Sequence, residues 1–356
     1  MNSKAVIAMS GGVDSSVAAS LMLDSGYECI GVTLKLYSGG SRCCSLEDIN
    51  DARQVAWRLD IPHYVLNFTG EFETNVIRPF VETYMRGETP NPCIDCNRFI
   101  KWKALLQRAA QLGFDRLVTG HYAQIERDTV SGRFLLKKAE DLQKDQSYVL
   151  YMLIQDELQR TLFPLGAMNK ARVRSIAEEK NFITAKKNDS QDICFVPSGD
   201  YGAFIETRIG KPLEEGEIVN MQGKVIGRHR GLARYTLGQR RGLAVACNEP
   251  VYVAAKSIRN NSVTLGPETS LYSKSLTIRD INLIPFERIE KPVRVKVKTR
   301  YLQKEQGATA EQCGPDEIRI DFDEAQRAIT PGQAAVMYDG SYVVGGGTIC
   351  STIPAR

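Results

Sequence analysis

The chain has 356 residues, of which 43% are hydrophobic and 25% charged, a composition that supports two or three domains with ordinary soluble cores. It holds no apolar run of about 18 residues, and its start, M-N-S-K-A-V-I-A-M-S-G-G, lacks the segments of a signal peptide, so we expect a cytoplasmic protein. Nine dispersed cysteines argue against a disulfide framework, and the net charge of +4 is too small to identify a partner.

The first half of the chain alternates between patterns typical of strands and of helices. Short apolar runs bounded by turn residues predict buried strands, and apolar residues three or four positions apart predict helices between them. In chain order the expected elements are strand 4–9, helix 17–26, strand 28–36, helix 46–59, strand 62–68, helices near 72–85 and 98–111, and strand 116–122. This spacing predicts an α/β domain built on a doubly wound parallel sheet.

The second half changes character. Residues 145–153 and 171–180 carry helical patterns that we expect to complete the first domain. From about Val196 onward, period-two alternation between turn residues predicts short strands, and the strands near the C-terminus predict a β-barrel. The expected domains are an α/β catalytic domain, a small β-rich module and a C-terminal β-barrel, at 1–197, 198–268 and 269–356.

The segment S-G-G-V-D-S-S, Ser10 to Ser16, lies between the first predicted strand and the first predicted helix. It lacks the lysine of a Walker A loop and the glycine spacing of a dinucleotide fingerprint. Glycines that admit an anion, followed by a helix N-terminus, are typical of a phosphate site, although a plain strand-to-helix turn has the same outline. Asp14 within such a site needs a cation beside it, and ATP with Mg²⁺ is the simplest explanation.

Basic residues cluster in the second half of the chain. Residues 224–241 hold six Lys or Arg and no acid, and residues 291–301 hold five more. Such stripes suggest a polyanionic partner, although a charged run is more often simply a solvated face.

The loop S-G-G-V-D-S-S resembles the PP-loop of the N-type ATP pyrophosphatases, enzymes that cleave ATP to pyrophosphate and pass AMP to an oxygen of their substrate. Motifs along nearly the whole chain are similar to those of the bacterial tRNA-specific 2-thiouridylases: T-P-N-P-C-I-D-C-N, G-H-Y, K-D-Q-S-Y, D-S-Q-D-I-C-F, Y-T-L-G-Q-R-R-G-L, K-T-R-Y and T-P-G-Q-A-A-V. The resemblance implies ATP-dependent 2-thiolation of the wobble uridine of certain tRNAs, through adenylation of the C2 oxygen, sulfur transfer and release of AMP.

The same resemblance implies site residues. Cys96 corresponds to the nucleophile that helps to release sulfur, and Cys194 corresponds to the cysteine that carries a persulfide. The residues implied for ATP binding are Ala8, Met9, Ser10, Gly11, Gly12, Val13, Asp14, Ser15, Leu34 and Gly120. Those implied for tRNA binding are His121, Lys144, Asp145, Gln146, Arg300, Tyr301 and Gln333. An ordinary core role stays open for Leu34 and for His121.

Cys93 departs from the simple two-cysteine pattern, because some family members carry Asp at its position and this chain has Asp95 two residues later. A C-x-x-C pair with one remote cysteine resembles the members in which three thiolates hold a 4Fe-4S cluster. Cys93, Cys96 and Cys194 would then be its ligands, with zinc on the same residues as a further alternative. Cluster and cluster-free persulfide relay both stay open, and Cys43 and Cys44 stay unassigned.

Two other classes of function explain parts of the sequence. A synthetase that adenylates a small molecule accounts for the loop but leaves the three cysteines and the basic stripes unexplained. A non-catalytic iron-sulfur RNA-binding protein leaves the intact loop unexplained. The family further implies a cysteine desulfurase or a sulfur-relay protein as partner, and a monomeric chain.

Overall fold

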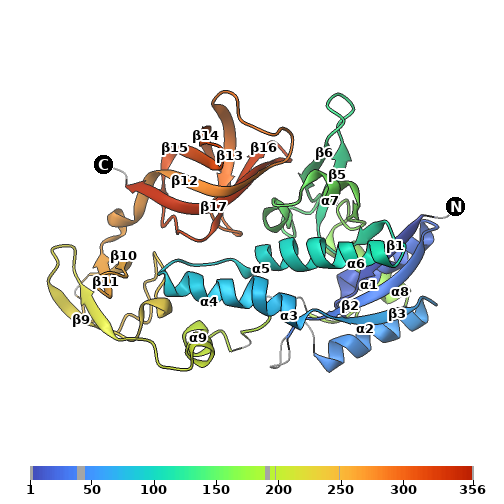
Figure 1. The fold of residues 1–356 in the computed structure, drawn as a ribbon, viewed down its shortest axis with the longest axis horizontal. Coiled ribbons are helices and arrows are strands. Elements are labelled where there is room, and N and C mark those ends of the chain that lie inside the picture. Colours follow the sequence, from blue (N-terminus) through green and yellow to red (C-terminus); the bar gives the residue numbers. More distant parts are fainter. Residues whose placement is uncertain (1–2, 38–44, 189–192, 197, 248, 355–356) are drawn as a thin grey trace. The chain divides into compact units, whose positions relative to one another are not determined.

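Figure 1 shows the fold of the computed structural model, which describes residues 3–37, 45–188, 193–196, 198–247 and 249–354. The chain divides into two compact units. The first unit consists of Met1–Val76, Pro92–Gly199 and Ser341–Val343, and the second of Ile77–Asn91, Asp200–Gly340 and Val344–Arg356. The finer division into three domains, at 1–197, 198–268 and 269–356, stays a prediction.

The first unit is built on a five-stranded parallel sheet. Its strands are β1 (Lys4–Ala8), β2 (Glu28–Lys35), β3 (His63–Asn67), β4 (Arg116–Val118) and β7 (Thr161–Leu162). They are hydrogen-bonded in the order β3-β2-β1-β4-β7, and every pairing is parallel. The order reverses at β1, because the chain adds β2 and β3 on one side of it and β4 on the other. The carboxyl ends of β1 and β4 therefore flank the point where open α/β sheets bind their ligands.

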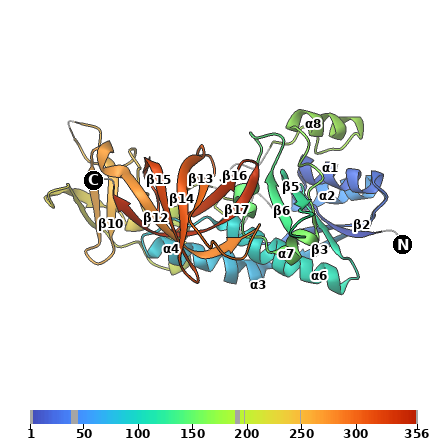
Figure 2. The same cartoon turned by 90° about the horizontal axis from the view of Figure 1, so that it is seen from above.

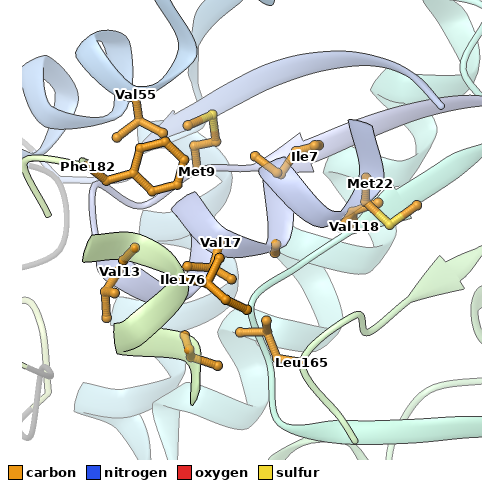
Figure 3. Close-up of a cluster of buried hydrophobic side chains, with 14 of the residues drawn as sticks. Ile7, Met9, Val13, Val17, Met22, Val55, Val118, Leu165, Ile176 and Phe182 are labelled. Atoms are coloured by element: carbon orange, nitrogen blue, oxygen red, sulfur yellow. The ribbon is translucent and has the colours of Figure 1, made fainter. Parts of the chain in front are cut away.

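Three helices share the core of this unit with the sheet: α1 (Val13–Asp24), α2 (Leu46–Arg58) and α8 (Lys170–Glu179). Most residues of α1 are buried, because the helix contacts β1, β2, α2 and α8. Figure 3 shows the shared apolar cluster, which includes Ile7, Met9, Val17, Val55, Val118, Leu165 and Ile176. This cluster holds both ends of α1 against the sheet.

The chain between β3 and β4 is largely helical. Its elements other than α4, which belongs to the second unit, are α3 (Thr69–Phe72), η1 (Glu73–Ile77), α5 (Pro92–Asp95), η2 (Cys96–Leu105) and α6 (Leu106–Gln111). Both η1 and η2 are π-helical, a form that is often found at functional sites. The helix expected at 98–111 begins at Pro92 instead, because proline fits the first position of a helix. Cys93 and Cys96 therefore lie within a helix.

The first unit is completed by the antiparallel hairpin of β5 (Ala123–Arg127) and β6 (Phe134–Lys138), the 3-10 turn η3 (Ser147–Leu150) and α7 (Gln155–Gln159). The helix expected at 171–180 is confirmed as α8. The helix expected at 145–153 is wrong in extent, because only η3 forms there, where the Asp145 carboxylate accepts the Ser147 N–H at 3.2 Å. The strand expected at 116–122 ends already at Val118.

The second unit contains α4 (Arg78–Met85) and α9 (Tyr201–Ile209). The prediction that the chain after Val196 forms only strands is wrong at α9. Asp200 caps the first turn of α9 by accepting the Ala203 N–H at 2.9 Å, and Gly210, with φ of 70°, follows its last turn. These two end signals are present in the sequence, but the strand patterns that follow them dominated the prediction.

The expected β-rich module is a four-stranded sheet in the order β10-β11-β8-β9. Its strands are β8 (Gly216–Val219), β9 (Val225–His229), β10 (Tyr252–Ser257) and β11 (Ser262–Gly266). The 3-10 turns near it are η4 (Leu232–Arg234) and η5 (Glu268–Leu271). The sheet has its own small apolar core around Ile218, Val253 and Val263.

A closed six-stranded β-barrel follows, drawn in orange and red in Figures 1 and 2. Its strands are β12 (Tyr272–Leu283), β13 (Val293–Lys298), β14 (Gln306–Gly314), β15 (Glu317–Arg327), β16 (Ala334–Asp339) and β17 (Tyr342–Pro354). They pair in the order β12-β15-β14-β13-β16-β17, and the pairing of β12 with β17 closes the barrel. Val295 and Val297 alternate with exposed lysine and arginine along β13 and enter the barrel core. The expected fold class, a parallel-sheet α/β domain followed by a β-rich module and a C-terminal barrel, is confirmed.

Candidate active site

The loop Ser10–Ser16 joins β1 to α1 at the carboxyl edge of the parallel sheet. Gly11 has φ of 72°, and a Cβ on it would collide with the carbonyl oxygen of Asp48, so this position requires glycine. Gly12 is the N-cap of α1 in an extended conformation and has no side chain with which to cap the first turn. Because the first N–H groups of a helix have no intrahelical acceptor, this end of α1 suits an anion.

The serines of the loop stabilise its shape. Ser15 Oγ accepts the N–H of Ser10 at 3.2 Å and donates to the Gly12 carbonyl at 3.1 Å. Ser16 Oγ donates to the same carbonyl at 2.8 Å and accepts from the Thr184 hydroxyl at 3.0 Å. Ser15 and Ser16 are buried, whereas Ser10 is exposed. Ser10 is therefore the loop serine that a ligand reaches most easily.

Asp14 is paired with a cation that the sequence analysis missed. Lys170 Nζ, at the first residue of α8, donates to both carboxylate oxygens of Asp14 at 2.7 and 2.8 Å. The Tyr122 hydroxyl donates to the same carboxylate at 2.8 Å. In this structure a lysine supplies the cation beside Asp14, so Asp14 does not need Mg²⁺ for that purpose. No local pattern marks Lys170, since 156 residues separate it from Asp14.

Gly120 lies directly against the loop. A Cβ on it would lie 2.8 Å from both the backbone nitrogen of Ser15 and the carbonyl carbon of Asp14. The segments that follow β1 and β4 therefore meet where the strand order reverses. Leu34, in β2, is 8% exposed and lies opposite Leu66 of β3. Of the other residues implied for ATP, Ala8 ends β1, Met9 follows it and Val13 begins α1.

His121 follows Gly120 and lies among aromatic side chains. Its ring centroid is 5.5 Å from that of Trp102 and 6.0 Å from that of Phe163, and its Nδ1 is 2.7 Å from the Thr119 hydroxyl. Burial, assisted by the positive charge of Lys101, lowers the pKa of His121 well below its usual range. His121 is therefore a neutral imidazole near pH 7, which can share hydrogen bonds but adds no positive charge for RNA.

The structure places Cys93 and Cys96 one turn apart on the helix that starts at Pro92. Cys93 is exposed and Cys96 is partly buried. Cys194 is partly buried in a turn in which the N–H of Val196 bonds the carbonyl of Ile193 at 3.0 Å.

Phe195, next to Cys194, anchors this turn in the first unit. Its side chain is 2% exposed, and its ring meets that of Phe72 edge to face, with the centroids 5.6 Å apart. Phe72 ends α3, and α3 packs against η2, the segment that begins with Cys96. The anchor thus ties the Cys194 turn to the helices beside Cys96.

The cluster expectation requires Cys93, Cys96 and Cys194 to converge on one metal site. Within the described ranges, no three or more His, Cys, Asp or Glu side chains are grouped so that they could hold a metal ion. Among these residues the structure thus shows no assembled ligand set for a 4Fe-4S cluster or a zinc ion, and the cluster stays a prediction. Cys43 and Cys44 lie outside the described residues.

A second lysine holds the chain that leads toward Cys194. Lys187 Nζ donates to Asp48 and Asp51 of α2, at 2.7 and 2.6 Å. Partial burial acts to lower the pKa of Lys187, but the hydrogen bonds and charges of the two carboxylates outweigh it and raise that pKa. Lys187 therefore remains charged and ties this segment to the helix whose Asp48 carbonyl confines Gly11.

The residues Lys144, Asp145 and Gln146 lie on one loop before η3. Asp145 is 8% exposed, and its oxygens accept from the N–H groups of Ala139 and Ser147 and from the Ser147 hydroxyl. Gln146 Oε1 accepts the N–H of Tyr122 at 3.0 Å. Asp145 and Gln146 thus shape the loop, while Lys144 is the member that carries positive charge. Their contact with tRNA stays a prediction.

Arg300, Tyr301 and Gln333 lie in the second unit. The Arg300 guanidinium donates to the carbonyls of Leu237 and Ala328, at 3.2 and 2.9 Å, and to the Thr330 hydroxyl at 2.8 Å. Tyr301 is 36% exposed, enough for one face of its ring to meet a base. Arg300 therefore links three segments of the second unit, and its contact with tRNA stays a prediction.

Gln333 has a role in the second unit that the sequence analysis missed. Its Nε2 donates to the carbonyls of both Thr89 and Pro90, each at 3.0 Å. The Thr89 N–H in turn bonds the Pro331 carbonyl at 2.9 Å. Gln333 thus holds the residues that lead into N-P-C-I-D-C-N, and its contact with tRNA stays a prediction.

A parallel sheet whose order reverses at β1, with a glycine-rich loop leading into α1 at that point, defines a nucleotide-binding α/β domain. Residues 3–198 match the family model described as the tRNA methyl transferase HUP domain. Residues 202–267 match the tRNA methyl transferase PRC-barrel domain, and residues 273–349 match the aminomethyltransferase beta-barrel domain.

Relatives match the chain over its whole length. It is 48% identical to the tRNA-specific 2-thiouridylase MnmA of Acetivibrio thermocellus, over 97% of this chain and 99% of the relative. It is 48% identical to the protein of the same name in Clostridioides difficile, over 98% of each. A solved 4-thiouridine synthetase–RNA complex with bound ATP has 17% identity and a TM-score of 0.37, over 54% of this chain and 44% of that one. The chain belongs to the tRNA-specific 2-thiouridylase family, which confirms the resemblance.

No helix among the described residues is both long and apolar enough to cross a membrane.

Proposed function

We propose that this protein replaces the C2 oxygen of the wobble uridine of certain tRNAs by sulfur, with consumption of ATP. The observation that carries the proposal is the full-length identity of 48% to relatives named tRNA-specific 2-thiouridylase. The loop Ser10–Ser16 supports it independently, because a glycine-shaped helix N-terminus at the switch point of a parallel sheet suits the phosphates of a nucleotide.

The chemistry begins with activation, because a uracil carbonyl oxygen is a poor leaving group. The C2 oxygen attacks the α-phosphorus of ATP, and pyrophosphate leaves. The product is an O-adenylyl group, from which AMP can depart. In this step the N–H groups at the start of α1, admitted to the phosphates by Gly11 and Gly12, stabilise the charge that develops on the phosphate oxygens.

Sulfur then arrives through the cysteines. The outer sulfur of a Cys194 persulfide attacks C2, and AMP leaves with the oxygen. Cys96, as a thiolate, attacks Sγ of Cys194 and breaks the sulfur–sulfur bond, which frees the 2-thiouridine and leaves the two cysteines joined. An external thiol reduces that disulfide. A 4Fe-4S cluster on Cys93, Cys96 and Cys194 stays the alternative to this persulfide relay.

The partners follow from the same proposal. A cysteine desulfurase or a sulfur-relay protein charges Cys194, and the chain acts as a monomer. The basic stripes at 224–241 and 291–301, together with Lys144, bind tRNA phosphates. His121 and Tyr301 contact unpaired bases of the anticodon loop, where a target base must be turned out of the stack.

The decisive experiment follows two products in one reaction. Unmodified tRNA, ATP with Mg²⁺ and a persulfide donor are incubated with the purified protein, and pyrophosphate and 2-thiouridine are both measured. We expect tRNA-dependent release of both, and a Cys194→Ser variant that releases pyrophosphate but forms no 2-thiouridine. Failure to release pyrophosphate with every tRNA of the cell would overturn the proposal.

A further inference from the structure

We propose that Lys170 is the built-in counterion of the loop Ser10–Ser16 and supports nucleotide binding by neutralising Asp14, so that Asp14 is not a ligand of the metal that accompanies ATP. The inference rests on the proposed function only in that the loop binds a nucleoside triphosphate. It concerns the chain's own charges, which the structure shows directly.

The contact between Lys170 and Asp14 is close and sheltered. Nζ lies 2.7 and 2.8 Å from the two carboxylate oxygens, so one ammonium group spans both acceptors. The lysine side chain is 12% exposed and the aspartate side chain 30%. Tyr122 reinforces the pair, because its hydroxyl donates to Asp14 at 2.8 Å and Nζ lies 5.7 Å from its ring centroid. This pair is more sheltered from solvent than an exposed surface ion pair.

The backbone places Lys170 at this position. Asn169 caps α8 by accepting the Arg172 N–H at 2.8 Å, which makes Lys170 the first residue of the helix. The Lys170 N–H also donates to Asp141 at 3.2 Å. Because α8 packs along α1, its first residue reaches the first turn of α1.

The charges explain why the pair matters to a polyphosphate. An unpaired carboxylate in the first turn of α1 would repel phosphate at the very place where the helix N-terminus attracts it. With Lys170 on both oxygens, the pair is close to neutral and the attraction of the helix N-terminus remains. The sequence alone suggested that Mg²⁺ supplies this neutralisation, whereas the structure supplies it from within the chain.

The disagreement with a metal at Asp14 is geometric as well as electrostatic. A divalent ion on Asp14 would have to lie beside the Lys170 ammonium group, which already bonds both carboxylate oxygens and would repel the ion. Mg²⁺ is commonly held by the phosphates themselves with few protein carboxylates. The metal that enters with ATP can therefore be carried by the phosphates while Asp14 keeps its lysine.

The chain offers a matched control on the same pair of helices. Lys180, just after α8, donates to Asp24, the last residue of α1, at 3.1 and 3.3 Å. This second pair also links α8 to α1, but it lies at the opposite end of α1 from the loop and is exposed. Lys180→Met therefore removes an α8–α1 ion pair without touching the loop.

The test measures binding of a non-hydrolysable ATP analogue to the full-length protein by calorimetry, with Mg²⁺ and with EDTA. We expect Lys170→Met to weaken binding at least tenfold in both conditions, and Lys180→Met to leave it within twofold of the wild type. We expect Lys170→Arg to retain most of the affinity. The double variant Asp14→Asn with Lys170→Met should recover most of it in EDTA, because it removes both charges together. Thermal unfolding of each variant verifies that the fold is intact.

Two results would overturn the proposal. One is a Lys170→Met protein that is folded and binds the analogue as well as the wild type does. The other combines two observations. Removal of Mg²⁺ weakens analogue binding equally in the wild type and in Lys170→Met, and the double variant Asp14→Asn with Lys170→Met recovers no affinity. Neither result involves tRNA or sulfur, so it leaves the thiolation assay to judge the proposed function separately.

Discussion

The anchor of the Cys194 turn leads to a prediction that separates sulfur transfer from ATP chemistry. Phe195 is 2% exposed and meets Phe72, which is fully buried, edge to face at an interplanar angle of 80°. Replacing Phe195 by leucine removes the aromatic pair, worth about 1 kcal/mol, and fills the space less well, which costs about 1 kcal/mol more. We expect the free energy of unfolding of the first unit to fall by about 2 kcal/mol.

The functional effect should be confined to the sulfur step, since Phe195 adjoins Cys194. A misplacement of a reacting group by about 1 Å can cost up to a hundredfold in rate, so we expect 2-thiouridine formation to fall at least about tenfold. Pyrophosphate release should stay within about twofold, because it depends on the loop Ser10–Ser16, which is held by its own hydrogen bonds to Gly12 and Thr184. Both products are measured in the same reaction, at a temperature well below unfolding.

Phe80→Leu is the matched control for this variant. Phe80 is also fully buried and meets Tyr84 edge to face, with centroids 5.0 Å apart, but it lies in the second unit. Its ring also meets those of Tyr201 and Phe204, so we expect Phe80→Leu to lower stability by at least as much, without separating the two products. Equal losses of both products in Phe195→Leu, or a stability unchanged by that variant, would refute the anchoring role of Phe195.

Three further predictions concern single side chains. Gly11→Ala should abolish binding of an ATP analogue in calorimetry, since φ of 72° and the Asp48 carbonyl leave no room for a Cβ; retained affinity would contradict the loop geometry. Because the folded-state pKa of His121 is depressed, the unfolded chain binds a proton below about pH 6.5 that the folded chain does not, so stability falls from pH 7 to pH 5. His121→Gln should make this fall shallower in denaturant titrations, and an unchanged pH dependence would contradict the depressed pKa of His121. Gln333→Ala removes two hydrogen bonds to loop carbonyls and should lower stability in denaturant titrations by about 1–2 kcal/mol; an unchanged stability would contradict the structural role of Gln333.

Local pattern in the sequence was sufficient for much of the architecture. Period-two alternation predicted the barrel strands, because one face of each strand is buried and the other exposed. The glycine-rich turn between a strand and a helix predicted the loop Ser10–Ser16, and the φ of Gly11 shows why glycine is needed there. The extent of helices was less well predicted, as at 145–153 and at α9, because side-chain contacts and end caps compete with periodicity.

Only the tertiary structure decided which side chains distant in the sequence contact one another. Lys170 reaches Asp14 across 156 residues, and Gln333 reaches Thr89 across 244. Neither contact leaves a local pattern, since each depends on how α8 packs on α1 or how the barrel loop meets the segment before the cysteines. The sequence by itself determined the family, the phosphate loop and the cysteines available for sulfur. The structure determined that the cation beside Asp14 is a lysine of the chain, because only packing brings those two side chains within hydrogen-bonding distance.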